Sequence, residues 1–521
     1  MAETFLSDPP EVTLAGVIEE PYNLAIAAAR TCYSSSGILT THDVMKDEKA
    51  IALRDKIARS TLEAGHLTTR QHATFVFALD RISRQFIWSF LHSHPFYNSE
   101  QVSQRYVKVA PGHYTIPPMN ERNSQRYQKV VRFQIDAYNQ LIERLMPDIR
   151  RRFFGLFPAR EKNAAVYEPK LKKRAYEVAR YVLPVATHAY MYHTVSALTL
   201  LRYWRISEMF DTPFEQRYVV KKMIEEVMRV DPDFQKEVRN PIPLNETPEY
   251  HLMQEGKPAV QVREFLDEFD RSLEGHVSRL VDYKDRAESV LAQSVRDLFG
   301  LSSACLPDDE AIEAVMDPAK NRYFGDTLNL TTLSKLARAM VHPHYTFRKK
   351  ISHTADSQDQ RHRMTPASRP ILSCHYSGKA DYILPMLVRE NDGVREFYEA
   401  AMEEVFDGIN ELLSDGLNPE YALYLLPNAF PIRFEESGDL LNLHHKWRIR
   451  SCYDAQEEIF FATIDEIEQV SAVHPRIARH IRAPCYLRKM SGEKPFCPEG
   501  DRYCGVPVWK QEIERYRERI L

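Results

Sequence analysis

The chain has 521 residues, of which 44% are hydrophobic and 27% are charged. This composition is that of an ordinary globular protein, and the length predicts two or more domains. The formal net charge of −4 gives no overall basic field, so neither a nucleic-acid partner nor a membrane surface is expected. Only 17 glycines are present, which favours helices over tightly turned β structure.

The first residues, MAETFLSDPPEV, lack the basic and apolar segments of a secretory signal. No apolar run reaches the roughly 18 residues that a membrane-spanning helix needs. The seven cysteines form an odd number, which without a secretion signal predicts reduced thiols. We therefore expect a cytoplasmic protein.

Three segments predict secondary structure. TFVFALD at 74–80 alternates apolar and polar residues, which predicts a strand. EFLDEFDRSLEGHVSRLVDYKDRAESVLAQSV at 264–295 is the clearest amphipathic pattern in the chain and predicts one long helix. Between them, the segment that follows Pro184 predicts a helix from apolar residues at helical spacing: Val185, Tyr192, Val195, Leu198 and Leu201.

The sequence repeats itself. Residues 180–207 read RYVLP and then a run ending in WRIS, and residues 423–450 read LYLLP and then a run ending in WRIR. In both runs the proline precedes the tryptophan by the same 20 positions. Upstream, HATF at 72–75 is echoed by HYTF at 344–347. Matched motifs in the same order predict an internal duplication, although two unrelated helices that share short motifs would look similar.

The repeat predicts the domain organisation. Copy one covers about 10–275, with a helical extension over about 212–275, and copy two covers about 280–480. A cysteine-containing tail, 481–521, follows. The expected fold class is α/β (α+β) and helix-rich, with two diverged copies of one fold.

Two charged segments are candidates for binding. NSEQVSQRY in copy one contains an arginine beside a serine and a carboxylate, a set that can hold a phosphate while orienting a sugar or a polar ring. A solvated surface is the alternative. Its candidate residues are Glu100, Gln101, Ser103 and Arg105. SQDQRHRMTPASR in copy two contains Gln358 and the triplet Arg361, His362 and Arg363. Like charges this close are unfavourable unless an anion or an electron-rich ring lies beside them.

The two copies have also exchanged charges. Directly before the YVLP or YLLP motif, copy one has Arg180 where copy two has Leu423. Directly after WRI, copy one has Ser207 where copy two has Arg450. This pattern suits a shared pocket to which each half supplies one side, although independent drift of surface residues would produce it too.

These residues resemble the flavin-dependent thymidylate synthases. The signature of that family is an RHR triplet followed by spaced serines, an acidic residue and an arginine-tyrosine pair, and here it looks split between the copies. The triplet at 361–363 resembles the first part, and Glu100, Ser103 and Arg105, followed by Tyr106, resemble the second. GHLTTRQH is similar to the family's flavin loop. Its matching residues are His66, Thr68 and Gln71.

By this resemblance, Arg180 and Arg450 match the two arginines of the family that bind phosphate and base. The chain would be an enzyme that methylates dUMP to dTMP with methylenetetrahydrofolate as one-carbon donor, NADPH as reductant and FAD as cofactor. Family members are homotetramers, so a fused pair is expected to form a homodimer that rebuilds a pseudo-tetramer. Of four ancestral sites, two would survive.

The sequence departs from the family in several places. Copy one has HSHP at 92–95 where the triplet is expected, and copy two has TPASRP where the serine and arginine are expected. The family's asparagine-x-arginine flavin contact is absent from both copies, where Ser196 and Leu198, and Asp439 and Leu441, stand instead. Two alternatives therefore stay open: another one-carbon transfer to a pyrimidine nucleotide, and a non-catalytic nucleotide-binding descendant.

The cysteines do not indicate a classical thymidylate synthase with a cysteine nucleophile, because none of them has the context of an activated thiolate. Those considered are Cys32, Cys305, Cys374 and Cys452. In the tail, His480, Cys485, Cys497 and Cys504 form either a structural zinc site or a set of ordinary reduced cysteines. No C-x-x-C pair is present to decide between the two.

Overall fold

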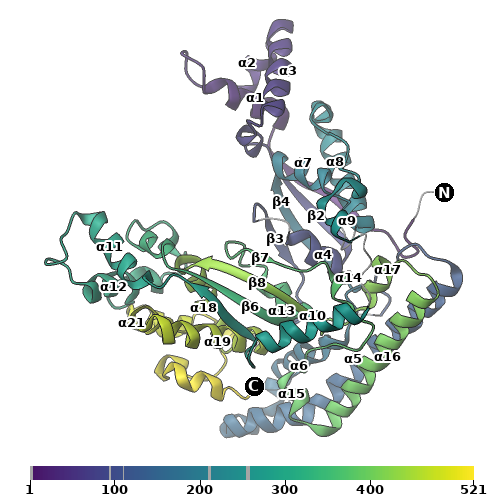
Figure 1. Cartoon of the computed structure of the whole chain (residues 1–521), viewed down its shortest axis with the longest axis vertical. Helices are drawn as coiled ribbons and strands as arrows, with labels where there is room; N and C mark the ends of the chain where they lie inside the picture. Colours follow the sequence, from purple (N-terminus) through teal and green to yellow (C-terminus); the bar gives the residue numbers. More distant parts are fainter. Residues whose placement is uncertain (1–3, 93–94, 110, 209–212, 254–258) are drawn as a thin grey trace. The chain divides into compact units, whose positions relative to one another are not determined.

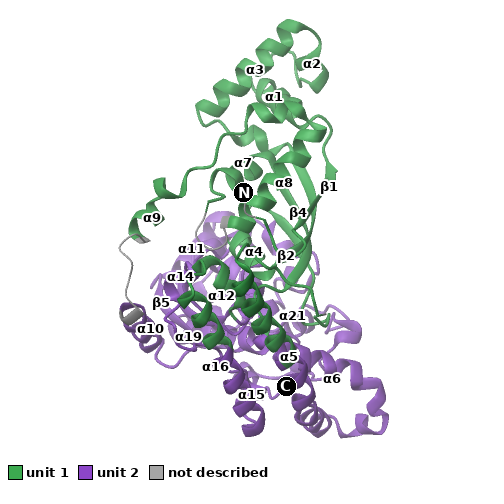
Figure 2. Cartoon of the chain, turned by 90° about the vertical axis from the view of Figure 1, so that its right-hand side faces the viewer, with its two compact units in different colours: residues 1–136, 183–258, 405–426 green, residues 137–182, 259–404, 427–521 purple. Residues whose placement is uncertain are grey.

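The structure is a computed structural model that describes residues 4–92, 95–109, 111–208, 213–253 and 259–521 (Figure 1). It divides into two compact units, each made of three pieces of chain (Figure 2). Unit 1 comprises Met1–Asp136, Leu183–Pro258 and Val405–Leu426, and unit 2 comprises Ala137–Val182, Ala259–Glu404 and Pro427–Leu521. The architecture is mixed α/β and helix-rich, as the sequence predicts.

Unit 1 is built around an antiparallel sheet in the order β1-β2-β4-β3. The predicted strand at 74–80 is confirmed as part of β2, whose alternate side chains Phe75, Phe77 and Leu79 are buried in the core. The strands are β1 (Glu11–Val17), β2 (Thr74–Ser83), β3 (Asn98–Gln101) and β4 (His188–Ser196). The helices that lie wholly in this unit are α1 (Pro21–Thr31), α2 (Thr41–Met45), α3 (Glu48–Glu63), α4 (Arg84–Leu91), α7 (Ala197–Arg205), α8 (Pro213–Val230), α9 (Pro248–Met253) and α17 (Pro419–Ala422).

Unit 2 repeats this plan with a sheet in the order β5-β6-β8-β7. Its strands are β5 (Ser278–Tyr283), β6 (His344–Ser352), β7 (Ala367–Ser368) and β8 (Pro431–Asp439). Its helices are α6 (Ala164–Ala179), α10 (Ala259–Ser272), α11 (Ala287–Phe299), α12 (Asp308–Met316), α13 (His353–Asp359), α14 (Leu372–His375), α15 (Met386–Arg389), α18 (Leu440–Arg450), α19 (Glu457–Val473), α20 (Pro475–Ala478) and α21 (Pro484–Met490). Helices α5 (Glu121–Leu156) and α16 (Asp392–Ser414) cross the boundary between the units.

The sheet register corrects one sequence match. β4 begins at His188, four residues after Pro184 of its LP motif, and β8 begins at Pro431, four residues after Pro427. Val195 of β4 pairs with Phe75, and the equivalent Gly438 of β8 pairs with Tyr345. Tyr345, not Phe347, is therefore the counterpart of Phe75, and the HATF/HYTF match is two residues out of register. A shift by two keeps every side chain on its face, so the pattern alone could not reveal it.

A second correction concerns the two predicted helices. The segment after Pro184 forms strand β4 and only then helix α7, and its buried residues alternate along the strand with period 2. The long helix predicted at 264–295 is interrupted by strand β5. The break falls at Glu274 and Gly275, whose φ values of 51° and 87° lie in the left-handed region.

Each unit contains a segment that belongs, by sequence, to the other copy, and a repeated buried contact holds that segment. In unit 1, Glu215 on α8 accepts hydrogen bonds from the Ser83 amide (2.8 Å) and the Ser83 hydroxyl (2.6 Å). It also accepts one from the hydroxyl of Tyr424 (2.7 Å), which precedes the LP motif of copy two. Ser83 caps α4 as well, through the amide of Phe86.

The same arrangement recurs in unit 2 with the copies reversed. Glu458 on α19 accepts hydrogen bonds from the amide (2.5 Å) and the hydroxyl (2.6 Å) of Ser352, the residue that caps α13. The hydroxyl of Tyr181, which precedes the LP motif of copy one, donates to the same carboxylate at 2.6 Å. The two copies have thus exchanged equivalent segments, while the predicted copy boundaries stay a prediction.

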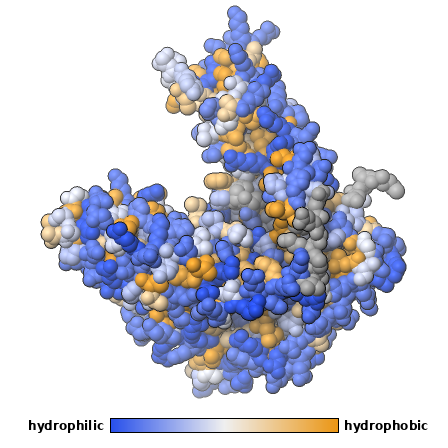
Figure 3. Space-filling view, viewed as in Figure 1, coloured by the Kyte–Doolittle hydropathy of each residue, from blue (hydrophilic) through white to orange (hydrophobic). Residues whose placement is uncertain are grey.

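The face of the molecule seen in Figure 3 is mostly hydrophilic, with hydrophobic side chains in scattered patches. No described helix is long and apolar enough to cross a membrane.

Candidate functional site

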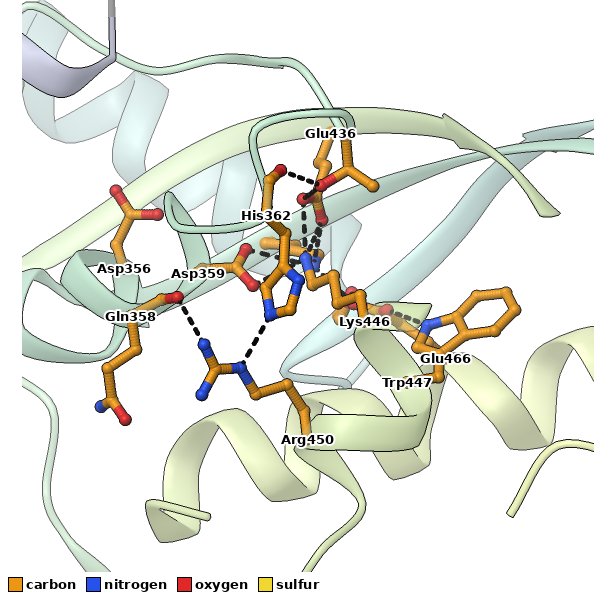
Figure 4. A network of polar contacts seen from close by, with 12 residues as sticks. Asp356, Gln358, Asp359, His362, Glu436, Lys446, Trp447, Arg450 and Glu466 are labelled. Atoms are coloured by element: carbon orange, nitrogen blue, oxygen red, sulfur yellow. Dashed lines mark hydrogen bonds and ion pairs between the residues drawn. The ribbon is translucent and has the colours of Figure 1, made fainter. Parts of the chain in front are cut away.

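Three of the predicted site residues meet in unit 2, between the end of α13 and the end of α18 (Figure 4). The Nε of Arg450 donates a hydrogen bond to Nε2 of His362 at 3.0 Å. The same guanidinium donates through Nη2 to the backbone oxygen of Gln358 at 2.8 Å. The planar fork of the arginine therefore fixes both the imidazole and the helix end that carries it.

The arrangement requires a neutral imidazole, because Nε2 of His362 accepts the hydrogen bond from Arg450. Burial, the Arg450 guanidinium and the Lys446 ammonium together hold the pKa of His362 well below its usual value. At neutral pH the imidazole is then uncharged between cations and can accept a hydrogen bond.

A buried group of charges supports this helix end. The Nζ of Lys446 lies 2.6 Å from Oδ1 of Asp359 and 2.6 Å from each carboxylate oxygen of Glu436. The hydroxyl of Thr365 lies 2.7 Å from Glu436 and 2.9 Å from the backbone oxygen of His362. Although burial alone would raise it, Lys349 and Lys446 hold the pKa of Asp359 well below its usual value.

The group extends beneath the sheet. Lys349 on β6 forms ion pairs with Glu436 and, at 2.6 Å, with Glu466. Glu466 also accepts hydrogen bonds from the indole of Trp447 (2.6 Å) and the hydroxyl of Ser278 (2.8 Å). We refer to Lys349, Lys446, Asp359, Glu436 and Glu466 as the buried charge cluster. All five side chains are at most 2% exposed.

The other predicted residues of unit 2 lie at different depths. Arg361 is exposed and Arg363 half-buried, on the loop that follows α13. Arg180 is buried, and its Nε donates to the backbone oxygen of Glu177 at 3.2 Å. Its own backbone oxygen accepts a hydrogen bond from Asn428, directly after the LP motif of copy two.

Arg180 and Arg450 belong to different sequence copies, yet both lie in unit 2. Their uncharged counterparts, Leu423 and Ser207, both lie in unit 1. The exchange of charges seen in the sequence is therefore an exchange of segments: one unit has kept both arginines and the other has neither.

The predicted phosphate segment lies in unit 1. Glu100 and Gln101 form the end of β3, and Gln101 accepts a hydrogen bond from Arg84 at 3.0 Å. The hydroxyl of Ser103 accepts a hydrogen bond from the Arg105 amide at 3.2 Å, which shapes the turn after the strand. The structure does not bring this set together with the residues around His362 in one unit.

The predicted flavin loop also lies in unit 1. His66, Thr68 and Gln71 are exposed on and beside the short helix η1 (Thr68–Gln71). Arg70 within this loop is fully buried and pairs with Glu237 at 2.6 Å. This ion pair anchors a loop whose predicted binding residues point to solvent.

In unit 1 the position of the triplet is occupied differently. Ser83 caps α4 and Ser352 caps the equivalent helix α13. His92 and Arg361 lie the same number of residues after these caps, so His92 occupies in unit 1 the position that Arg361 has in unit 2. The next two positions of HSHP, 93–94, lie outside the described residues. The positions of the missing asparagine-x-arginine contact are helix starts: Ser196 caps α7 and Asp439 caps α18.

The tail differs from the zinc set considered from sequence. His480 accepts a hydrogen bond from Arg479 at 3.0 Å and does not line the pocket that the tail cysteines surround. Within the described parts of the chain, no group of three or more His, Cys, Asp and Glu side chains is arranged to hold a single metal ion. Burial raises the pKa of Cys452 to about 12, which agrees with the absence of an activated thiolate there.

Sequence reasoning missed the buried charge cluster. A signal was present, because FRKKIS at 347–352 puts lysines inside a strand that carries apolar residues on its core face. A lysine in such a position needs a buried carboxylate partner. The partners come from β8, α13 and α19, which only the fold brings together.

The fold and site define a helix-rich α/β protein with two equivalent sheets, one of which carries an arginine–histidine site. The family model described as thymidylate synthase complementing protein matches the chain twice, over residues 13–233 and 279–476. The chain belongs to this family, and the double match is consistent with an internal duplication.

The chain is also similar to individual proteins named flavin-dependent thymidylate synthase. It is 24% identical to one from Clostridium tetani over 226 residues, which cover 43% of this chain and 85% of that protein. It is 29% identical to one from Geobacter sulfurreducens, with 35% of this chain and 76% of that protein covered. For one from Sulfurisphaera tokodaii the identity is 30%, with 29% of this chain and 59% of that protein covered.

Proposed function

We propose that this chain is an FAD-dependent thymidylate synthase that methylates dUMP to dTMP, with methylenetetrahydrofolate as one-carbon donor and NADPH as reductant. The observation that carries the proposal is the contact of Arg450 with His362 and Gln358 in unit 2, the unit that also contains Arg180. The residues that resemble the family's two arginines and the histidine of its triplet thus lie in one unit, whereas Leu423 and Ser207 stand at the two arginine positions of the other unit.

The chemistry of these residues fits a flavin ring and a pyrimidine nucleotide. The Nε2 of Gln358 is buried and has no hydrogen-bond partner in the described part of the chain, so an amide donor is available to a carbonyl edge. Arg361 and Arg363 flank a neutral imidazole and provide donors for an electron-rich ring that gains negative charge. The flavin, when bound, supplies hydride transfer.

Each residue then has a role in the proposal. Gln358 and Arg450 orient the uracil edge. Arg361, His362 and Arg363 hold the flavin ring and stabilise negative charge at it through fixed donors, an electrostatic effect of the oxyanion-hole type.

The residues of the other segments bind rather than react. Ser103, Arg105 and Arg180 bind phosphate and sugar through charge-assisted hydrogen bonds, with Glu100 and Gln101 beside them. His66, Thr68 and Gln71 bind the flavin or its pyrophosphate. The chain is proposed to act as a homodimer.

The test is tritium release from [5-³H]dUMP, because methylation at C5 of uracil displaces the hydrogen at that carbon. We expect release by the purified protein that requires FAD, NADPH and methylenetetrahydrofolate together, and that is lost in the double variant Arg361→Ala, His362→Ala. Identification of the product as dTMP separates this reaction from another one-carbon transfer. Folded protein that binds FAD but releases no tritium would contradict the proposal.

A further inference from the structure

Four cysteines from separate stretches of the sequence surround one pocket in unit 2. Cys452 follows α18, Cys485 lies in the first turn of α21, and Cys497 and Cys504 lie in the tail. Four of the seven cysteines in the chain therefore converge on a single site.

The four thiols lie near enough to influence one another. Burial raises the pKa of Cys485 to about 12, and the neighbouring thiols of Cys497 and Cys504 add to the shift. Burial also raises the pKa of Cys452 to about 12, with Cys504 and Cys485 contributing. These mutual influences link all four thiols, so the four cysteines form one group.

The arrangement does not suit a single ion. Zinc held by four cysteines needs Zn–S distances of about 2.3 Å, which draws all four sulfurs around one point. Among the residues that the structure describes, no three His, Cys, Asp or Glu side chains are arranged in this way. A larger inorganic group with several metal atoms lets four cysteine sulfurs lie farther apart, because they bind different metal atoms of the group.

We propose that Cys452, Cys485, Cys497 and Cys504 ligate an iron–sulfur cluster. Four cysteine thiolates are the ligand set of both the two-iron and the four-iron clusters. The pocket places such a cluster against apolar and aromatic side chains, among them Tyr453, Tyr503 and Val508.

The cluster would also fasten the tail to the end of helix α18. Cys452 lies two residues after Arg450, the residue that contacts His362. The ligands in the tail lie about 30 to 50 residues further along the chain, so the cluster closes a long loop there. Loss of the cluster is therefore expected to loosen the helix end that positions Arg450. This consequence rests on the proposed function, whereas the presence of the cluster does not.

The experiment is metal and sulfide analysis of the full-length protein purified without oxygen. We expect about two to four irons and an equal amount of acid-labile sulfide per chain, with an electron paramagnetic resonance signal after reduction by dithionite. Cys497→Ser and Cys504→Ser should lose iron and sulfide together. The matched controls Cys32→Ser and Cys305→Ser, at exposed cysteines outside the pocket, should retain both.

Circular dichroism of each variant shows whether it folds, which separates loss of the cluster from loss of the fold. The iron and sulfide content of the wild-type protein tests the proposal without any variant. Zinc as the sole metal at one per chain would overturn the proposal. So would protein that contains no iron after anaerobic reconstitution with iron and sulfide. Protein that contains iron and sulfide but releases no tritium would support the cluster and contradict only the proposed enzymatic activity.

Discussion

The two sheets share one topology, but the side chains buried at equivalent positions are charged in one and uncharged in the other. Counted from the LP proline, His193 and Glu436 are both nine residues on, and Tyr203 and Lys446 are both 19 residues on. Unit 2 buries an ion pair between Glu436 and Lys446, whereas unit 1 buries a 3.2 Å contact between His193 and Tyr203. The sheet register places Leu79 where unit 2 has Lys349.

The difference shows that the fold itself does not need buried charges. The unit 1 positions, with Leu79 and Tyr203 in a hydrophobic core, support the same sheet. Buried ion pairs are often no more stabilising than well-packed apolar residues of similar volume. We infer that unit 2 keeps the buried charge cluster because it positions Asp359 and, three residues on, His362. The unit without the two arginines also lacks the buried charges.

The largest expected effect comes from breaking the cluster at Lys446. Lys446→Met leaves Glu436 and Asp359 buried with one cation fewer, which should lower the stability by about 3–5 kcal/mol. The matched change in unit 1, Tyr203→Phe, removes one hydrogen bond to His193 and should lower it by about 1 kcal/mol. Urea unfolding followed by circular dichroism measures both. Equal losses of stability would show that the fold depends no more on the buried charge cluster than on the His193–Tyr203 pair of unit 1.

The next effect is on catalysis. Arg450→Ala should lower tritium release from dUMP by about 100-fold or more, because removing one preorganised donor typically has an effect of this size. Ser207→Ala at the equivalent position of unit 1 should leave the rate within about twofold. The rates are compared at saturating cofactors. A similar loss from Ser207→Ala would mean that unit 1 takes part in the reaction at this position.

The exchanged segments provide a symmetrical test. Tyr181→Phe removes the hydroxyl that donates to buried Glu458, and Tyr424→Phe removes the one that donates to buried Glu215. Each change should lower the stability by about 1.5–3 kcal/mol, as expected for a hydrogen bond to a charged group. Thermal unfolding of the single variants should show a loss in both, larger for Tyr181→Phe because the Tyr181 hydroxyl also accepts a hydrogen bond from Gln456. A large shift from one and none from the other would refute the equivalence of the two contacts.

The smallest effect is a dependence on pH. The pKa of His362 is held below that of an unfolded histidine, so below about pH 6.5 the unfolded chain takes up the proton first. The contribution of His362 to stability is therefore full above pH 6.5 and decreases as the pH falls, by up to about 1.4 kcal/mol per pH unit. The free energy of unfolding is measured against pH for the wild type and for His362→Gln, and the difference between the two curves gives the contribution of His362. The matched control is His42→Gln, at an exposed histidine.

The sequence predicted the parts of the molecule that depend on local pattern. The alternation in 74–80 predicted β2, and the motif spacing predicted two equivalent halves. It also predicted Gln358, His362 and Arg450, which the structure brings into contact. Their binding roles stay predictions.

The sequence pattern could not predict features that depend on contacts between residues far apart in the chain. β4 carries apolar residues that also fit a helical period, and only its pairing with β2 and β3 decides for a strand. The exchange that places Arg180 in unit 2 depends on where α5 takes the chain, which no local signal encodes. The cysteine set changed for the same reason: Cys452 joins the pocket from 33 residues before Cys485, and His480, close in sequence, does not.

The central claim is that unit 2 alone retains the arginine–histidine site, and the stoichiometry of nucleotide binding tests it most directly. Calorimetric titration of the FAD-loaded protein with dUMP should give about one site per chain, a value fixed by the one unit that keeps both arginines. Arg450→Ala should abolish this binding and Ser207→Ala should preserve it. Two sites per chain, or binding that survives Arg450→Ala, would contradict the account.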